Sequence, residues 1–274
     1  MTHTMSREFL SLVNGRVEVE RFNVDAPGPT LVFLHEGLGC VSLWKDFPQL
    51  IASASGLDTL VYSRFGYGAS DPVELPRPLS YMHDEALDIL PMVLDAAGIR
   101  RCILIGHSDG ASIALIAAGG TGDARIEGLV LMAPHVFTEP DGLASIDSAR
   151  QAFERGLRDR LKKYHGDNVD CAFRGWNDAW LDPGFVNWNL EEYLPAIRVP
   201  SLIIQGRDDE YGTLRQVDAI VSQSGGPVDT LILDNCGHSP QRDQPGATSE
   251  AIFRFLATVT TQTPHVELAT QQSF

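Results

Sequence analysis

The chain has 274 residues, with 21 lysines and arginines against 36 aspartates and glutamates, and a formal net charge of −15. This length allows one large domain or two small ones, and it is sufficient to bury a sizeable core. The acidic surplus of the composition argues against nucleic acid or an anionic membrane surface as a partner.

The N-terminal region predicts an exposed hairpin of alternating polar and apolar residues, 9–12 and 16–21, with Asn14-Gly15 as its turn. Short aliphatic and β-branched runs then predict buried strands. They span residues 30–34, 59–63, 101–105, 128–132, 201–205 and 228–233. Helical patterns lie between them, over residues 82–97, 111–119, 213–224 and 248–258. This alternation predicts the α/β class: a doubly wound, mostly parallel sheet with helices on both faces.

Residues 136–199 contain no convincing buried strand and are rich in charged and aromatic residues. Helical patterns at 145–164 and 169–180 predict a helical lid, inserted after strand 128–132 and folded over the strand ends. Residues 1–135 and 200–258 would form the core, and the polar residues 259–274 a disordered tail. Three tryptophans of the lid segment could either line an apolar pocket or form the lid's own core. They are Trp176, Trp180 and Trp188.

The most informative stretch is Gly106-His107-Ser108-Asp109-Gly110, which follows an apolar strand and opens a helix of small residues. A serine at such a strand-to-helix turn has its hydroxyl lifted clear of the sheet. The two glycines allow close passage of the backbone, and the helix N-terminus presents N–H groups to a developing anion. His107 is expected to pack beside the serine. The pattern suits acyl transfer.

A serine hydroxyl becomes an effective nucleophile when a base takes its proton and an acid orients that base. Asp208 and Asp209 both follow strand 201–205, and His238 follows strand 228–233. The order Ser108, acid, His238 is the order expected for this kind of turn. Spacing alone leaves the choice between the two aspartates open.

Several motifs in this order resemble the α/β-hydrolase fold superfamily, in its serine hydrolase branch with a helical lid, from about residue 30 to 257. They are His35-Glu36-Gly37-Leu38-Gly39 with Trp44 beyond it, the segment 63–70, the elbow at Ser108, Gly206-x-x-Asp209, and Gly237-His238. The resemblance implies that Ser108 is the nucleophile, His238 the general base and then acid, and Asp209 the orienting carboxylate. It also implies an oxyanion hole made by the main-chain N–H groups of Gly37 and Asp109.

Two positions depart from the family pattern. Glu36 stands where a glycine is common, and Asp109 stands where methionine or glutamine is frequent. Carboxylates pointing at the oxyanion site would oppose the charge that develops there. We expect them to point away and to bond backbone or basic groups, with Arg64 the nearest basic candidate. We place Glu36, Arg64, Trp176 and Trp180 in the substrate pocket.

These residues predict hydrolysis of a small-molecule carboxylic ester, thioester or lactone through an acyl-enzyme, with no metal and no organic cofactor. Serine at position 108 argues against the epoxide hydrolase and haloalkane dehalogenase branches, whose pattern has aspartate there. Ser239-Pro240 after His238 argues against carbon–carbon bond hydrolases, which typically have tryptophan. That activity, a cofactor-free dioxygenase and a non-catalytic ligand receptor remain alternatives on the same fold. The acidic balance slightly favours neutral or cationic substrates.

Cysteine use and targeting signals bear on the compartment. Cys40, Cys102, Cys171 and Cys236 are scattered without metal-binding spacing. The first residues show no basic region followed by an apolar stretch, and no apolar run has the length of a membrane span. We therefore expect a reduced, cytoplasmic protein.

Overall fold

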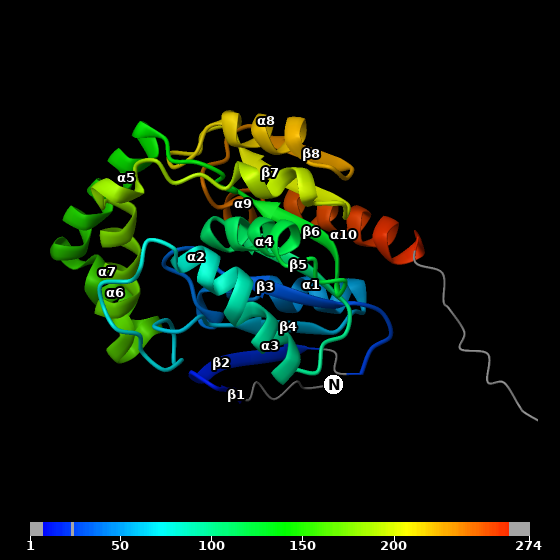
Figure 1. Ribbon diagram of the computed structural model, residues 1–274, viewed down its shortest axis with the longest axis horizontal. Coiled ribbons are helices and arrows are strands. Elements are labelled where there is room, and N and C mark those ends of the chain that lie inside the picture. Colours follow the sequence, from blue (N-terminus) through cyan, green and yellow to red (C-terminus); the bar gives the residue numbers. More distant parts are fainter. Residues whose placement is uncertain (1–7, 23–24, 263–274) are drawn as a thin grey trace, which may run out of the picture.

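The computed structural model describes residues 8–22 and 25–262 and contains one eight-stranded sheet in the order β1-β2-β4-β3-β5-β6-β7-β8 (Figure 1). The strands are β1 Glu8–Leu12, β2 Gly15–Phe22, β3 Thr30–Leu34, β4 Thr59–Tyr62, β5 Cys102–His107, β6 Ile126–Met132, β7 Ser201–Gly206 and β8 Val228–Leu233. Strands β3 to β8 are parallel, whereas β1 and β2 form an antiparallel hairpin whose second strand pairs with β4. The predicted α/β class is confirmed.

Helices cover both faces of this sheet because alternate residues of each strand point to opposite sides. In β3, Leu31 and Phe33 join one apolar cluster, and Val32 and Leu34 join the other. The first cluster is covered by α1 Phe47–Ser55 and α10 Pro245–Gln262. The second is covered by α2 Tyr81–Asp84, α3 Leu90–Ala96, α4 Asp109–Gly120 and α8 Leu214–Gln223.

The N-terminal hairpin is less exposed than its alternating sequence suggested. Val17 and Val19 of β2 are fully buried, because β2 lies between β1 and β4 and faces the core. Helix α1 was not predicted, although Pro48 stands in its first turn and Gly56 closes it in the left-handed conformation.

The helix expected over 82–97 forms, with a π-helical turn, η2 Glu85–Ile89, between α2 and α3. Pro91 follows directly in the first turn of α3. Proline has no N–H to donate to the carbonyl four residues earlier, so the regular ladder is interrupted at this point.

The segment 136–199 is helical, and Figure 1 shows its three longer helices grouped at one end of the molecule. The helix expected over 145–164 is interrupted where Arg155 and Gly156 leave helical geometry, the glycine at φ 112°. The elements are α5 Pro140–Ala152, η3 Phe153–Leu157, α6 Arg158–His165, η4 Gly166–Asn168, α7 Val169–Trp180, η5 Pro183–Phe185 and η6 Glu191–Ala196. A short 3₁₀ helix in the core, η1 Val41–Trp44, follows β3.

Helix α10 continues to Gln262, so residues 259–262, expected in the tail, are helical, and Val259 is buried. The rest of the expected tail, 263–274, lies outside the described residues. None of the helices within 8–22 and 25–262 combines the length and hydropathy that a membrane span requires.

Candidate active site

Ser108 occupies the sharp turn between β5 and α4. Its backbone has φ 53° and ψ −120°, a left-handed conformation that costs a non-glycine residue about 1–3 kcal/mol. A side chain on Gly110 would overlap the carbonyl of Leu34, and one on Gly106 would overlap the backbone of Gly110. Glycine at both positions therefore lets α4 leave the sheet immediately after the serine.

Ser108, His238 and Asp209 form a continuous hydrogen-bonded chain. The Oγ of Ser108 lies 2.9 Å from Nε2 of His238. The Nδ1 atom of the same ring lies 2.9 Å from both carboxylate oxygens of Asp209. The three residues come from the ends of β5, β8 and β7, which meet at one edge of the parallel sheet.

The Asp209 side chain is almost fully buried and accepts from three donors besides His238, of which the N–H of Gly212 is the most distant at 3.3 Å. Its Oδ1 accepts from the N–H of Tyr211 at 2.8 Å, and its Oδ2 accepts from the Gln205 side chain at 2.7 Å. Burial alone would raise the pKa of Asp209, but the hydrogen bond and charge of His238 outweigh it and lower that pKa to about 2. The carboxylate is therefore ionised at neutral pH. Asp208, the alternative acid, is exposed.

The His238 imidazole is enclosed by other rings. Tyr211, His107 and His135 have ring centroids 4.7, 5.2 and 5.5 Å from it. Burial acts to lower the pKa of His238, and the hydrogen bond and charge of Asp209 more than offset this, so that pKa is raised above 6.5. His107 holds the loop, because its Nε2 donates to the His238 carbonyl at 2.7 Å and its Nδ1 lies 3.1 Å from the Gln241 amide nitrogen.

The main-chain N–H groups of Gly37 and Asp109 donate to no acceptor in the described part of the chain. Both residues line the same cavity as Ser108. The Asp109 carboxylate is fully buried; its Oδ2 accepts from the Tyr81 hydroxyl at 2.6 Å and lies 3.9 Å from Arg64 Nη1. Burial raises the pKa of Asp109, which the charge of Arg64 and the Tyr81 hydrogen bond only partly counter.

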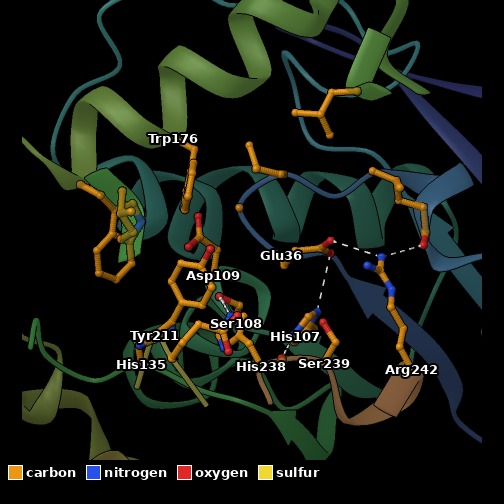
Figure 2. Close-up of a pocket in the computed structure, with 17 residues that line it drawn as sticks. Glu36, His107, Ser108, Asp109, His135, Trp176, Tyr211, His238, Ser239 and Arg242 are labelled. Atoms are coloured by element: carbon orange, nitrogen blue, oxygen red, sulfur yellow. Dashed lines mark hydrogen bonds and ion pairs between the residues drawn. The ribbon is translucent and has the colours of Figure 1, made fainter. Parts of the chain in front are cut away.

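Glu36 lies at the rim of the cavity with its side chain 20% exposed. Its Oε2 is 3.7 Å from His107 Nδ1, and its Oε1 is 3.8 Å from Arg242 Nη2, as Figure 2 shows. Burial would raise the pKa of Glu36, but His107 and Arg242 hold it well below its ordinary value.

Arg64 does not line the cavity, contrary to the expectation from sequence. The guanidinium lies behind the loop of Gly37, where Nη2 donates to the Glu36 carbonyl at 2.9 Å and Nε lies 3.3 Å from the His35 ring. These contacts, together with the Asp109 carboxylate, turn it inward to a position only 3% exposed. Arg64 supports the loop rather than touching a ligand in the cavity.

A cavity of about 300 Å³ opens onto Ser108 (Figure 2). Trp176 and Trp180 line it, whereas Trp188 does not and packs against Phe185 and Trp180. Sequence reasoning did not place several other lining residues in the pocket, among them His135, Tyr211 and Arg242.

The sequence contained only weak indications that His135 and Tyr211 line the cavity. His135 follows the end of β6, a position that points toward the site in a parallel sheet, and Tyr211 lies two residues beyond Asp209. Burial, with the charge of His238, lowers the pKa of His135 to about 3, so that ring is neutral. Within the described residues, no three or more histidine, cysteine or acidic side chains are grouped so as to bind a metal ion.

A parallel sheet of this order, with a serine on the turn from strand to helix, defines the class of α/β hydrolases. The model of the alpha/beta hydrolase family matches residues 31–251. The chain belongs to the α/β hydrolase family.

Individual relatives span several activities. The putative carbamate hydrolase RutD of Stutzerimonas stutzeri is 38% identical, over 72% of this chain and 77% of its own length. Epoxide hydrolase 3 of Xenopus tropicalis is 24% identical, over 85% of this chain and 72% of its own. The crystal structure of carboxylesterase CesB from Bacillus subtilis superposes with a TM-score of 0.68 at 20% identity, covering 93% of this chain and 92% of that one. The structural likeness shows a shared fold.

Proposed function

We propose that this chain is a serine hydrolase that cleaves a small-molecule carboxylic ester, thioester or lactone through an acyl-enzyme. The observation that carries the proposal is the continuous chain from Ser108 Oγ through the His238 ring to Asp209, with 2.9 Å at each link. Such an arrangement activates a serine and can pass its proton to a leaving group.

In the first half of the reaction, Ser108 Oγ attacks the carbonyl carbon while His238 Nε2 takes the hydroxyl proton. The carbonyl oxygen gains the negative charge and accepts from the free N–H groups of Gly37 and Asp109. The carbon–oxygen or carbon–sulfur bond to the leaving group then breaks, and His238 gives its proton to the departing atom. Asp209 stabilises the imidazolium throughout.

In the second half, a water molecule takes the place of the leaving group. His238 removes one of its protons, the resulting hydroxide attacks the acyl carbon, and a second oxyanion forms at the same site. Collapse releases the carboxylic acid, and the proton on His238 returns to Ser108 Oγ. Bonds and protons balance without any further reactant.

The shape and lining of the cavity support a small substrate. Its volume of about 300 Å³ is at the lower end of the range for small-molecule pockets. Trp176 and Trp180 supply apolar walls. Glu36 and Glu210 outnumber the single lining arginine, Arg242, and this negative balance favours neutral or cationic substrates over anionic ones. Both tryptophans belong to α7, so we propose that segment 136–199 acts as the lid of the site.

The relatives leave the scissile bond open among acyl derivatives. RutD is named as a putative carbamate hydrolase, and a carbamate carbonyl can be attacked in the same way as an ester carbonyl. The similarity to epoxide hydrolase 3 does not suggest an epoxide as substrate, because the residue at the elbow is Ser108 and not the aspartate of that branch.

Ser108→Ala tests the proposal. On p-nitrophenyl esters of increasing acyl length, we expect kcat to fall by several orders of magnitude, because the nucleophile is lost while binding groups remain. A fluorophosphonate should label the native protein at Ser108 and leave Ser108→Ala unlabelled. Near-native turnover by the variant would overturn the proposal, as would an unlabelled, folded native protein. Oxygen uptake or tight ligand binding without turnover would support the dioxygenase or receptor alternatives instead.

A further inference from the structure

The four tryptophans of the chain differ in what their indole nitrogens bond. Those of Trp44 and Trp188 are buried and have no acceptor in the described part of the chain. The nitrogen of Trp180 donates to the Tyr81 hydroxyl at 2.9 Å. Trp176 also has no acceptor among the described residues, but its nitrogen is not sealed off as those of Trp44 and Trp188 are, and the ring lines the cavity. Trp176 therefore offers a free donor to whatever occupies the cavity.

The free donor lies beside the proposed oxyanion site. A Cβ atom on Gly37 would overlap Cδ1 and Nε1 of Trp176, so the nitrogen-bearing edge of the indole packs directly against the Gly37 backbone. An indole N–H lies in the ring plane and projects from that edge. Figure 2 shows the Trp176 side chain reaching from its helix into the cavity, toward Asp109 and Ser108.

Helix α7 holds the ring in place before any ligand binds. Asn177, the next residue, is fully buried; its Nδ2 donates to the Ile146 carbonyl at 2.8 Å and its Oδ1 accepts from Arg150 at 3.1 Å. Phe173, one turn earlier, packs its ring against Trp176 with centroids 6.0 Å apart. A donor fixed in advance stabilises a transition state without a cost of reorganisation.

We propose that the indole N–H of Trp176 is a third donor to the oxyanion, beside the main-chain N–H groups of Gly37 and Asp109. This inference rests on the proposed function, because it concerns the oxygen of a carbonyl attacked by Ser108. It gives the helical segment a direct part in the reaction. An additional N–H at this position also helps to offset the negative charge of Glu36 at the rim of the cavity.

Trp176→Phe removes the N–H and keeps an aromatic ring. Removal of a single oxyanion donor costs about 10²–10³ in kcat in a well-studied protease. Here, with two main-chain donors left, we expect kcat to fall by at least about tenfold on every p-nitrophenyl ester, with KM changed by less than about twofold, because the bond strengthens only in the transition state.

Two inhibitors separate this role from simple packing. A trifluoromethyl ketone forms a hemiketal oxyanion with the serine, whereas the matching methyl ketone binds without the added charge. Trp176→Phe should weaken the first by the same factor as kcat and leave the second within about twofold. The inference would be overturned if Trp176→Phe weakened the binding of both ketones equally. It would also be overturned if kcat fell only for esters with an extra oxygen on the acyl group.

Trp188→Phe is the matched control. It deletes an indole N–H that also has no acceptor within the described residues, from a ring that does not line the cavity. We therefore expect Trp188→Phe to leave kcat and KM unchanged. If Trp176→Phe does not fold, 3-benzothienylalanine at position 176 replaces N–H by sulfur in a ring of the same shape. Retained kcat in that variant, with Ser108 still labelled by a fluorophosphonate, removes this inference and leaves the proposed function standing.

Discussion

The charge states of His238 and Asp209 determine how the site responds to pH. In the proposed mechanism His238 must be neutral to accept the Ser108 proton, and Asp209 raises the pKa of His238 above 6.5 despite burial. The protonated, inactive form therefore persists to a higher pH than for an ordinary histidine. We expect kcat/KM for an uncharged ester to rise with pH, with the midpoint of its acid limb above 6.5. A pH–rate profile with a midpoint at or below 6.5 contradicts this.

Two adjacent aspartates provide a direct test of which acid orients the histidine. Asp209→Asn should lower kcat on the order of 10⁴-fold, as the equivalent change does in a serine protease, because the amide no longer fixes the ring in the productive tautomer. Asp208→Asn, at an exposed position, should leave kcat within about twofold. Steady-state kinetics on one ester decides between them, and similar losses in both variants would reject the assignment.

The close contact between α4 and β3 is an element-scale constraint on the elbow. A Cβ on Gly110 would overlap the Leu34 carbonyl, which is backbone and cannot rotate away. Gly110→Ala should therefore force the helix from the sheet, at a cost of about 1–3 kcal/mol in the free energy of unfolding. Activity should fall as well, because Leu34 leads directly into the loop of Gly37.

Gly246→Ala is the control for that change. Gly246 lies in α10 with nothing within 4 Å of an added Cβ. Alanine there should leave the stability unchanged or raise it by up to about 1 kcal/mol, through helix propensity alone. Urea unfolding followed by circular dichroism measures both variants, and equal stabilities for the two would contradict the packing argument.

Elements with a strong local pattern could be predicted from sequence, and those set by neighbours could not. The central parallel strands are apolar runs because helices cover both faces, and β3 to β8 were all anticipated. Strand β8 was expected to be buried, but it lies at the edge of the sheet, and Asp229 and Thr230 are exposed. Helix α1 was not predicted because it is short and contains Pro48. A proline usually argues against a helix, and it fits the first turn only if the start of the helix is already known. The break at Gly156 was missed because charged residues on both sides suit a helix equally well.

The site shows the same division between local and tertiary information. The proximity of Ser108 and His238 was predictable, because the ends of parallel strands converge at one edge of the sheet regardless of loop conformation. The inward turn of Arg64 was not, because it depends on His35 and on the Glu36 carbonyl, which the fold brings together. The contact between Trp176 and Gly37 depends on how α7 packs, which no local pattern encodes.

At the scale of the whole molecule, the sheet and the helical segment contribute different things. The core brings together residues from β5, β7 and β8, whose relative positions are fixed by backbone pairing. The helical segment brings α7 and the cavity's aromatic wall. We therefore expect that changes in segment 136–199 can alter which substrate fits while Ser108 and His238 keep their positions at the ends of β5 and β8.

The net charge of −15, with Glu36 and Glu210 at the cavity, predicts discrimination against anionic substrates. The test uses two p-nitrophenyl esters of succinate, one with a free carboxylate and one in which that carboxylate is a methyl ester. The rate of p-nitrophenol release is to be measured for each. At low ionic strength kcat/KM for the anion should be at least about tenfold lower, because the field of the protein repels it. The ratio should shrink as salt shortens the screening length to about 8 Å near 0.15 M. Glu36→Gln should reduce the discrimination against the anionic ester that persists at high salt. Equal rates at low salt, or a ratio that does not change with salt, would show that shape alone selects the substrate.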